Sequence, residues 1–561
     1  MSILIRDVFA VDAEGVGAGP SDVLVDGDRI ARIAPAHTVD PGDAHVVDGR
    51  GRFLMPGFVD AHSHADGALF DPDVQLALLR QGVTTVIGGQ DGVSYAPGDG
   101  DYAAEYFAAI NGPHPSYRGG GIASLLAAYD GATAVNAGVL VPAGTVRFEV
   151  MGRSTDAASP DELARMRALV ADGLADGALG LSTGLDYVPG VFAGTDELAA
   201  LAAPVAAAGA VYVSHMRGGY EANSAAGIAE MAAIARASGA RVHVSHFHAE
   251  PHLVHELLAE LERDGVDATF DAYPYTRGCS ILAMPILPAS LTVRPAAEVV
   301  AELADPAVRA RLRREWFPTI TGYASLGPEW PSMLTLAHLA SPDFDWAHGL
   351  TIAQGAAEAS ARSGASIDAI DFALDVLVAS RLEVNVVMAV QYERSDAGLA
   401  EILSHPAGIG GSDGIFIGRH PHPRARGSFS RYLAMLVREQ ATIGWAAAAA
   451  LVSSRAVARF GLGDRGAVRE GVIADLVLVD PDAVRATASY AEPLGLGIGI
   501  DDVLVAGVPV LAGGALTGAT PGRGIRRVTE EATGPLVSHG THDIRRPVRH
   551  EPSRSDEAAE A

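Results

Sequence analysis

The chain has 561 residues, of which 48% are hydrophobic and 19% charged, so it is long enough to bury a large core as one large domain with additions or as several ordinary domains. Its formal net charge of −27 at pH 7 argues against nucleic acids and anionic membranes as partners, because an acidic surface repels both. The single cysteine, Cys279, excludes an intramolecular disulfide and a zinc site built from several cysteines.

The first residues, MSILIRDVFAVDAEG, show neither the basic region nor the apolar core and cleavage site of a signal peptide. No later run reaches the roughly 20 apolar residues that a membrane-spanning helix needs. We therefore expect a cytoplasmic protein that acts on a small molecule, and homo-oligomerisation is left open. The chain contains no lysine, so all 41 of its basic residues are arginines.

Short alternating strands separated by Asp and Gly turns open the chain, in ILIRDVFAVD, SDVLVDGDRIARIAP and AHVVDGRGRFLMPGF. Near the other end, GVIADLVLVDP and DDVLVAGVPVLAGG have the same pattern. This similarity predicts that residues 1–57 and 464–530 pair into one small β-sandwich domain.

Eight strand candidates alternate with Ala-rich helices between these ends. They are GFVDAHSH, TTVIGGQD, NAGVLVP, ALGLSTG, AVYVSH, RVHVSH, ATFDAYPY and GIGGSDG. Eight parallel strands with intervening helices fit a closed (β/α)8 barrel over residues 58–463, with the active site at the carboxyl ends of the strands. An open doubly wound sheet is the alternative, but no Gly-rich phosphate loop follows the first strand.

The span from about 276 to 350 breaks this alternation and holds three of the four tryptophans, Trp316, Trp330 and Trp346. It is several times longer than an ordinary loop of about 4 to 6 residues, so we predict an inserted cap over the active site. A peripheral addition unrelated to the substrate is the alternative. Residues 531–561 are polar and aperiodic, which predicts a disordered tail.

Histidines stand at the ends of three strand candidates. His62 and His64 are two residues apart on a strand, so both side chains point to one face. His215 and His246 close the segments YVSH and VHVSH. The spacing of His62 and His64 alone is weak evidence, but four histidines at strand ends on one barrel face predict a site for zinc or another divalent metal.

Two aspartates end strands on the same face. Asp413, in GIGGSDGIF, would supply the carboxylate that takes a proton from a metal-activated water, although SDG alone usually marks a turn. Asp91 closes VTTVIGGQD and is either a metal ligand or a residue that caps the turn before Gly92.

Several motifs together resemble the amidohydrolase superfamily, and within it the D-aminoacylase (N-acyl-D-amino-acid deacylase) branch. They are DAHSHAD, YVSHMRGG, VHVSHFH, FDAYPYTRG, SDG, PHPRARGSF and EGVIADLVLVDP. The likeness extends up to about residue 525. It implies a distorted TIM (β/α)8 barrel with a β-sandwich domain built from both termini, and one or two zinc ions or other divalent metals. The implied reaction cleaves the amide of an N-acyl amino acid, especially an N-acyl-D-amino acid, to a carboxylate and a free amino acid.

The resemblance also implies roles for individual residues. The metal ligands would be His62, His64, His215 and His246. Asp413 matches the catalytic acid and base, and Arg424 matches the residue that holds the α-carboxylate of the substrate. Tyr187 falls on the substrate side, and either Tyr273 or Tyr275 would polarise the amide carbonyl, with buried aromatic packing as the alternative for each. The nearby His243, His248, His420 and His422 are expected to lie outside the metal site.

Asp91 departs from the family pattern, in which a cysteine commonly stands at this position. A carboxylate is a harder ligand than a thiolate and can bridge two ions through separate oxygens. Many members of the superfamily bridge their metals with a carboxylated lysine, which a chain without lysine cannot form. We therefore expect Asp91 to be a metal ligand that bridges two ions.

Other functions stay open at the level of sequence. The superfamily also includes Nε-acyl-lysine deacylases, dipeptidases and cyclic amidases, and an arginine that binds a carboxylate favours acyl amino acids over cyclic imides. A non-catalytic structural homologue would be expected to lose metal ligands, whereas all four histidines and Asp413 are present here.

Overall fold

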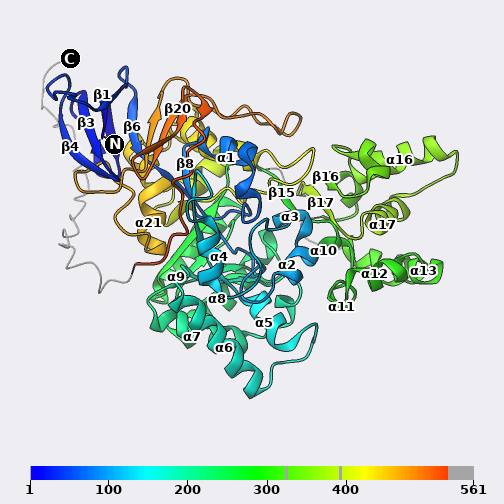
Figure 1. Ribbon diagram of the computed structural model, residues 1–561. Helices are drawn as coiled ribbons and strands as arrows, with labels where there is room; N and C mark the ends of the chain where they lie inside the picture. The colour runs from blue at the N-terminus through cyan, green and yellow to red at the C-terminus, as the bar shows by residue number, and fades with distance from the viewer. Residues whose placement is uncertain (1, 322–325, 391–393, 529–561) are drawn as a thin grey trace, which may run out of the picture.

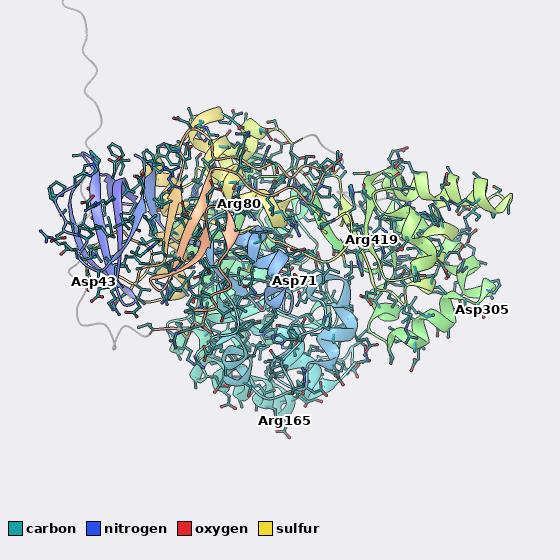
Figure 2. The ribbon with its side chains drawn as sticks, turned by 45° about the horizontal axis from the view of Figure 1, so that its top comes forward. Asp43, Asp71, Arg80, Arg165, Asp305 and Arg419 are labelled. Atoms are coloured by element: carbon teal, nitrogen blue, oxygen red, sulfur yellow. The ribbon has the colours of Figure 1, made fainter. Side chains whose placement is uncertain are left out.

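The computed structural model describes residues 2–321, 326–390 and 394–528, so the predicted disordered tail at 531–561 lies outside the described residues. Figure 1 shows a central α/β part with a β-sheet region on one side and a helical lobe on the other. Asp43, beside the β-sheet region, and Asp305, on the lobe, lie at opposite ends of the molecule in Figure 2. Within the described part of the chain, no helix has both the length and the apolar character needed to cross a membrane.

Eight parallel strands, one in each predicted segment, form the central part. They are β7 (Phe58–Asp60), β8 (Val83–Gly88), β9 (Asn136–Val139), β11 (Gly180–Gly184), β12 (Val211–His215), β13 (Arg241–Val244), β14 (Ala268–Ala272) and β18 (Gly408–Gly410). The amide of Leu179 donates to the carbonyl of Val139 at 2.9 Å, and that of Ala61 to Gly410 at 3.0 Å, which joins the two parallel sheets at both seams. The strands therefore follow one another around a (β/α)8 barrel, and the predicted fold class is confirmed.

The sequences of these strands fit their place inside the barrel. All six residues of β8, VTTVIG, are buried. Parallel strands covered on both faces are expected to be continuously apolar in this way, rather than alternating. Helices such as α6 (Pro160–Ala175) surround the barrel, and α6 begins with a capping box in which Ser159 and Glu162 satisfy each other's backbone amides. These elements bring the carboxyl ends of the strands to one face.

Strands from both ends of the chain form one sheet, as predicted. β1 (Ser2–Asp12) pairs with β3 (Ser21–Asp26) and β6 (Phe53–Pro56), and β6 pairs antiparallel with β19 (Leu476–Val479). Ile5, in the N-terminal strand β1, shares a hydrophobic cluster with Leu476 and Leu504 from the C-terminal strands. The domain limits at 57 and 464 stay a prediction.

A lobe leaves the barrel between β14 and β18. Its three antiparallel strands are β15 (Gly278–Ile281), β16 (Leu334–Leu339) and β17 (Val384–Met388), in the order β15-β17-β16. Eight helices, from α10 (Ala283–Ile286) to α17 (Ala369–Ala379), pack around a separate hydrophobic cluster that includes Trp330 (Figure 1). Because β17 ends at Met388, this lobe continues beyond the predicted limit at 350. The sequences of α16 (Ile352–Ser363) and α17 have a helical pattern. Such a pattern does not indicate on which core a helix packs, so the sequence analysis assigns both helices to the barrel.

Candidate metal centre and substrate cavity

A cavity of about 610 Å³ lies where the barrel strands end. Polar side chains of the barrel, including His64, Asp91 and His215, line one part of its wall. The lobe supplies apolar side chains to another part, namely Met284, Leu287, Trp316, Leu326 and Met388. One cavity therefore joins a polar floor to an apolar wall.

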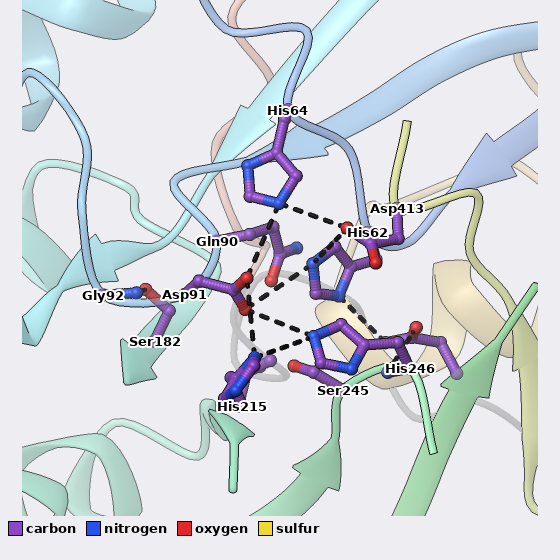
Figure 3. A network of polar contacts seen from close by, with 12 residues as sticks. His62, His64, Gln90, Asp91, Gly92, Ser182, His215, Ser245, His246 and Asp413 are labelled. Carbon is purple, nitrogen blue, oxygen red and sulfur yellow. Dashed lines mark hydrogen bonds and ion pairs between the residues drawn. The ribbon is translucent and has the colours of Figure 1, made fainter. Parts of the chain in front are cut away.

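Four histidines and one aspartate bring their ligand atoms together at this floor. They form two groups, His62 with His64 and Asp91, and Asp91 with His215 and His246, and the ligand atoms within each group lie within 4.8 Å of one another. Figure 3 shows the Asp91 carboxylate between the two histidine pairs. The structure thus brings together all five residues that the sequence assigned to the metal site.

Each oxygen of Asp91 faces one histidine of each pair. Oδ1 lies 3.7 Å from Nε2 of His62 and 3.8 Å from Nε2 of His246. Oδ2 lies 3.6 Å from Nε2 of His64 and 3.8 Å from Nδ1 of His215. Two ligands of one tetrahedral zinc ion are roughly 3.3 Å apart, because each bond is about 2.0 to 2.1 Å long. These separations therefore fit ions placed between Asp91 and the histidines better than direct hydrogen bonds.

The polar atoms of the site also fit a metal. Nε2 of His62 and Oδ1 of Asp91 are buried and have no hydrogen-bond partner among the described residues. Such buried atoms carry an energetic cost unless something pairs with them, and a cation would pair with both. Burial opposes ionisation of Asp91, but contacts with His246 and His64 outweigh it and hold the pKa of Asp91 well below its usual value. The residues therefore offer an anionic carboxylate and four imidazoles, a donor set typical of zinc.

Three residues of the site adopt left-handed backbone conformations. The φ angles are +54° at Asp91, +34° at His246 and +49° at Asp413. Non-glycine residues rarely adopt this conformation, and those that do are frequent at functional sites. Gly92 follows with φ of +71°, and a Cβ there would lie 2.8 Å from the amide nitrogen of Gly184 on β11. The tight turn after β8 therefore packs directly on β11 and presents the Asp91 side chain to the histidines.

In three of the histidines, one ring nitrogen contacts a polar side chain outside the two groups. These contacts are His62 Nδ1 to Asp271 at 3.3 Å, His64 Nδ1 to Asn111 at 3.2 Å and His215 Nε2 to Asp186 at 3.2 Å. The sequence did not single out these three partners. Only Asp271 carried a signal, because it is an acid within the strand segment FDAYPY. Asn111 and Asp186 lie in segments between barrel strands, where no strand periodicity marks them.

Asp413 lies between the histidines and Arg424. Its Oδ1 is 3.3 Å from Nε2 of His64, and its Oδ2 is 2.8 Å from Nη2 of Arg424. Burial opposes ionisation of Asp413, but the charges of Arg424 and His246 outweigh it and lower the pKa of Asp413 to about 2. Arg424 is fully buried, and its Nε and Nη1 have no hydrogen-bond partner within the described ranges. The site therefore contains an ionised carboxylate and a guanidinium with donors left for a ligand.

The three tyrosines named from the sequence take different positions. Tyr187 and Tyr273 line the cavity. The ring of Tyr187 lies 5.0 Å from that of His215, and the guanidinium carbon of Arg424 lies 4.5 Å from the centre of the Tyr273 ring. The ring of Tyr275 instead packs against His422 at 5.5 Å. Of the YPY pair, Tyr273 is therefore the residue that reaches the cavity.

The remaining histidines near these motifs are engaged elsewhere and belong to neither group. Their contacts are His243 Nε2 to Asp271 at 3.0 Å, His248 Nε2 to the Tyr273 carbonyl at 2.9 Å, His420 Nε2 to the Tyr490 carbonyl at 2.9 Å and His422 Nε2 to the Arg277 carbonyl at 3.0 Å.

Comparisons with known proteins agree with this geometry. The model of the amidohydrolase family matches residues 45–511. An N-acyl-D-aspartate deacylase from Alcaligenes xylosoxydans xylosoxydans is 31% identical over 524 residues, which cover 93% of this chain and 94% of that protein. A D-aminoacylase from the same organism is 30% identical over 545 residues, or 94% of this chain and 97% of that protein. The crystal structure of an N-acyl-D-glutamate deacylase from Bordetella bronchiseptica, complexed with zinc and a phosphonate mimic of the tetrahedral intermediate, is 27% identical with a TM-score of 0.74, and the match covers 93% of this chain and 99% of that chain.

Proposed function

Because the chain belongs to the amidohydrolase family, we propose that it hydrolyses the amide bond of N-acyl-D-amino acids to a carboxylate and a free amino acid. The observation that carries this proposal is the position of Arg424 and Asp413 beside two histidine groups that share Asp91, all in one cavity. The names of two similar proteins, an N-acyl-D-aspartate deacylase and a D-aminoacylase, support the linear amide and the D configuration.

Zinc is the proposed cofactor, as one or two ions. His62, His64 and Asp91 would hold one ion, and Asp91, His215 and His246 the other, so that Asp91 bridges the two. The zinc in the related deacylase supports this choice. When bound, zinc supplies Lewis acidity, which lowers the pKa of water and polarises an amide carbonyl.

Arg424 would bind the α-carboxylate of the substrate. Its guanidinium is fully buried, Nη2 contacts Asp413, and Nε and Nη1 have no hydrogen-bond partner among the residues described. A planar guanidinium with open donors is well suited to a carboxylate. The substrate would then extend from Arg424 toward the lobe, where Leu287 and Trp316 would pack against the acyl group.

Asp413 would act as the general base and then the general acid. Its low pKa keeps it ionised at neutral pH, so it can accept a proton from water, and its contact with His64 places it beside the metal ligands. The same proton would then pass to the departing amine. Tyr273 lines the same cavity, and its hydroxyl is the proposed donor to the amide oxygen.

A panel of substrates tests the proposed function. Metal-replete enzyme is incubated with N-acetyl-D-methionine, N-acetyl-L-methionine and Nε-acetyl-lysine, and the released amine is measured. We expect turnover of the D-enantiomer above the other two. Preference for Nε-acetyl-lysine, or failure to hydrolyse any acyl amino acid, would overturn the proposal.

Asp413→Asn tests the role of the carboxylate. The amide cannot take up a proton at this position, so kcat should fall by roughly 10² to 10⁴, the range typical of general acid and base catalysis. Zinc content should stay at the wild-type value, because Asp413 belongs to neither histidine group. Full activity in this variant would contradict the assignment.

A further inference from the structure

Asp271 is a buried carboxylate to which the proposed reaction assigns no role. It lies in β14, one residue before the end of the strand, and is fully shielded from solvent. Its Oδ2 lies 3.3 Å from Nδ1 of His62 and 3.0 Å from Nε2 of His243, and its Oδ1 accepts from the backbone amide of His246 at 2.8 Å. One side chain therefore contacts residues of both histidine groups.

The contact with His62 fixes which nitrogen of that ring can bind a metal. An ionised carboxylate only accepts hydrogen bonds, so the nitrogen that faces it, Nδ1, carries the proton. Nε2 is then left with its lone pair, and it faces Asp91 at 3.7 Å. Hydrogen bonds of this kind set the tautomer and the orientation of histidine ligands in metal sites.

The contact with His246 supports the second group through the backbone. His246 has a φ of +34°, a conformation that a non-glycine residue keeps only where its surroundings hold it. The hydrogen bond from its amide to Asp271 fixes this turn after β13, and the turn directs Nε2 of His246 toward Asp91 at 3.8 Å. His243 holds Asp271 from the other side, with its Nδ1 at 2.8 Å from Oγ1 of Thr269.

We propose that Asp271 is a positioning residue that preorganises both halves of the metal centre, through the ring of His62 and the backbone of His246. The inference rests on the metal centre of the proposed function, but not on the identity of the substrate. A protein that binds zinc and hydrolyses no acyl amino acid would overturn the proposed function and leave this inference intact.

Asp271→Asn tests the proposal through zinc affinity, measured by competition with a chromophoric chelator. The asparagine amide presents an N–H donor where Asp271 offers only acceptors, so it opposes the protons on His62 and His243. We expect the affinity for zinc to fall roughly 10- to 100-fold, as is usual when such partners of metal ligands are lost. The visible spectrum of the cobalt-substituted protein should also change, because the His62 ligand is no longer held in place.

Asp475→Asn is the matched control. Asp475 is another buried carboxylate, whose oxygens accept from the backbone amide of Ala506 at 2.6 Å and from Nε of Arg465 at 2.9 Å. Its replacement should leave zinc affinity unchanged. Wild-type affinity in folded Asp271→Asn, or an equal loss in both variants, would overturn the proposal. If circular dichroism shows that Asp271→Asn is unfolded, Asp271→Ala, which adds no opposing donor, must show the same loss of affinity.

Discussion

Asp91 combines two properties that rarely occur together in one residue. It lies in the turn that follows the fully buried strand β8, and its left-handed conformation turns its carboxylate toward two pairs of histidines. The neighbouring Gln90 donates to the carbonyls of Ala61 and Ile87 and so stabilises the same turn from inside the barrel. A residue that only capped this turn would not need both of its oxygens to face imidazole nitrogens.

Replacing Asp91 tests its role as a shared ligand. Asp91→Ala removes a donor from both groups, so zinc stoichiometry and affinity should both fall, as measured by elemental analysis after dialysis. Asp91→Cys restores an anionic donor and should recover part of the zinc content. Unchanged zinc binding in Asp91→Ala would instead favour a role limited to the turn.

Zinc binding should also release protons. Burial opposes a charge on His64, but contacts with Asp413 and Asp91 outweigh it and raise the pKa of His64 to about 10 in the metal-free protein. His64 must be neutral to bind zinc, so at pH 8 it loses a proton on binding, and apparent affinity should rise with pH up to about 10. Calorimetry in two buffers that differ in ionisation enthalpy measures this release, and a value of zero protons would contradict the prediction.

The folding stability of the metal-free protein should fall as the pH rises, whereas zinc affinity should increase. Because the pKa of His64 is raised above its ordinary value of 6.5, the charged ring stabilises the fold fully below pH 6.5. This contribution is lost as the pH rises through about 10.

The candidate site was predictable where strand periodicity and residue type coincide. His215 ends an apolar strand and His246 follows another in the next turn, and the sequence pattern predicts both positions. Asn111 could not be found in this way, because its contact with His64 joins a short helix to a strand end far away in the sequence. No sequence signal distinguishes Tyr273 from Tyr275, because only packing separates the two rings.

At the level of elements, each of the eight barrel strands coincides with a predicted segment to within one residue at its start or lies inside it, because buried apolar runs that end in polar residues are a strong local signal. The lobe was only partly predictable. Its strands β15 and β17 pair across more than a hundred residues of sequence, as the pair Cys279 and Val387 shows. No local sequence pattern predicts a pairing over this separation. The cap at about residues 276–350 stays a prediction, and the lobe that the structure shows extends to Met388.

Trp316 tests the contribution of the lobe to substrate binding. Its ring lines the cavity, and its Nε1 donates to the carbonyl of Ile286 at 3.0 Å. Trp316→Ala should raise KM for N-octanoyl substrates about tenfold and change KM for N-acetyl substrates little, because only a long acyl chain would lose the apolar contact. Steady-state kinetics measure both values.

Trp346→Ala is the control for this experiment. Trp346 lies in the same lobe but packs against the Arg362 guanidinium, with the guanidinium carbon 4.4 Å from the ring centre. Its replacement should leave both KM values unchanged. An equal change in the two variants would indicate a general loss of lobe structure.

At the level of the whole molecule, the metal centre draws on strands from across the barrel. His62 follows β7, Asp91 follows β8 and His246 follows β13, so the ligands meet only when the two parallel sheets come together. The order of the strands in the sequence is consistent with a closed barrel. The contacts that close it, such as the hydrogen bond from Ala61 to Gly410, join residues far apart in the sequence and are seen only in the structure.

Removal of metal should therefore lower global stability. A ligand that binds only the folded state adds about 4 kcal/mol when its concentration is a thousand times its dissociation constant. Treatment with a chelator should lower the melting temperature, and addition of zinc should restore it, as followed by calorimetry. Asp91→Ala should respond much less to either treatment.

The sheet built from both ends of the chain has a consequence for synthesis. Met55 on β6 pairs with Val477 on β19, so one edge of the N-terminal strands lacks its partner until almost the whole protein has been translated. At about 5 to 20 residues per second, this edge stays open for roughly 20 to 80 seconds on the ribosome. An open strand edge can pair with another nascent chain, so the yield of soluble protein should depend on translation speed and on chaperones that shield the edge.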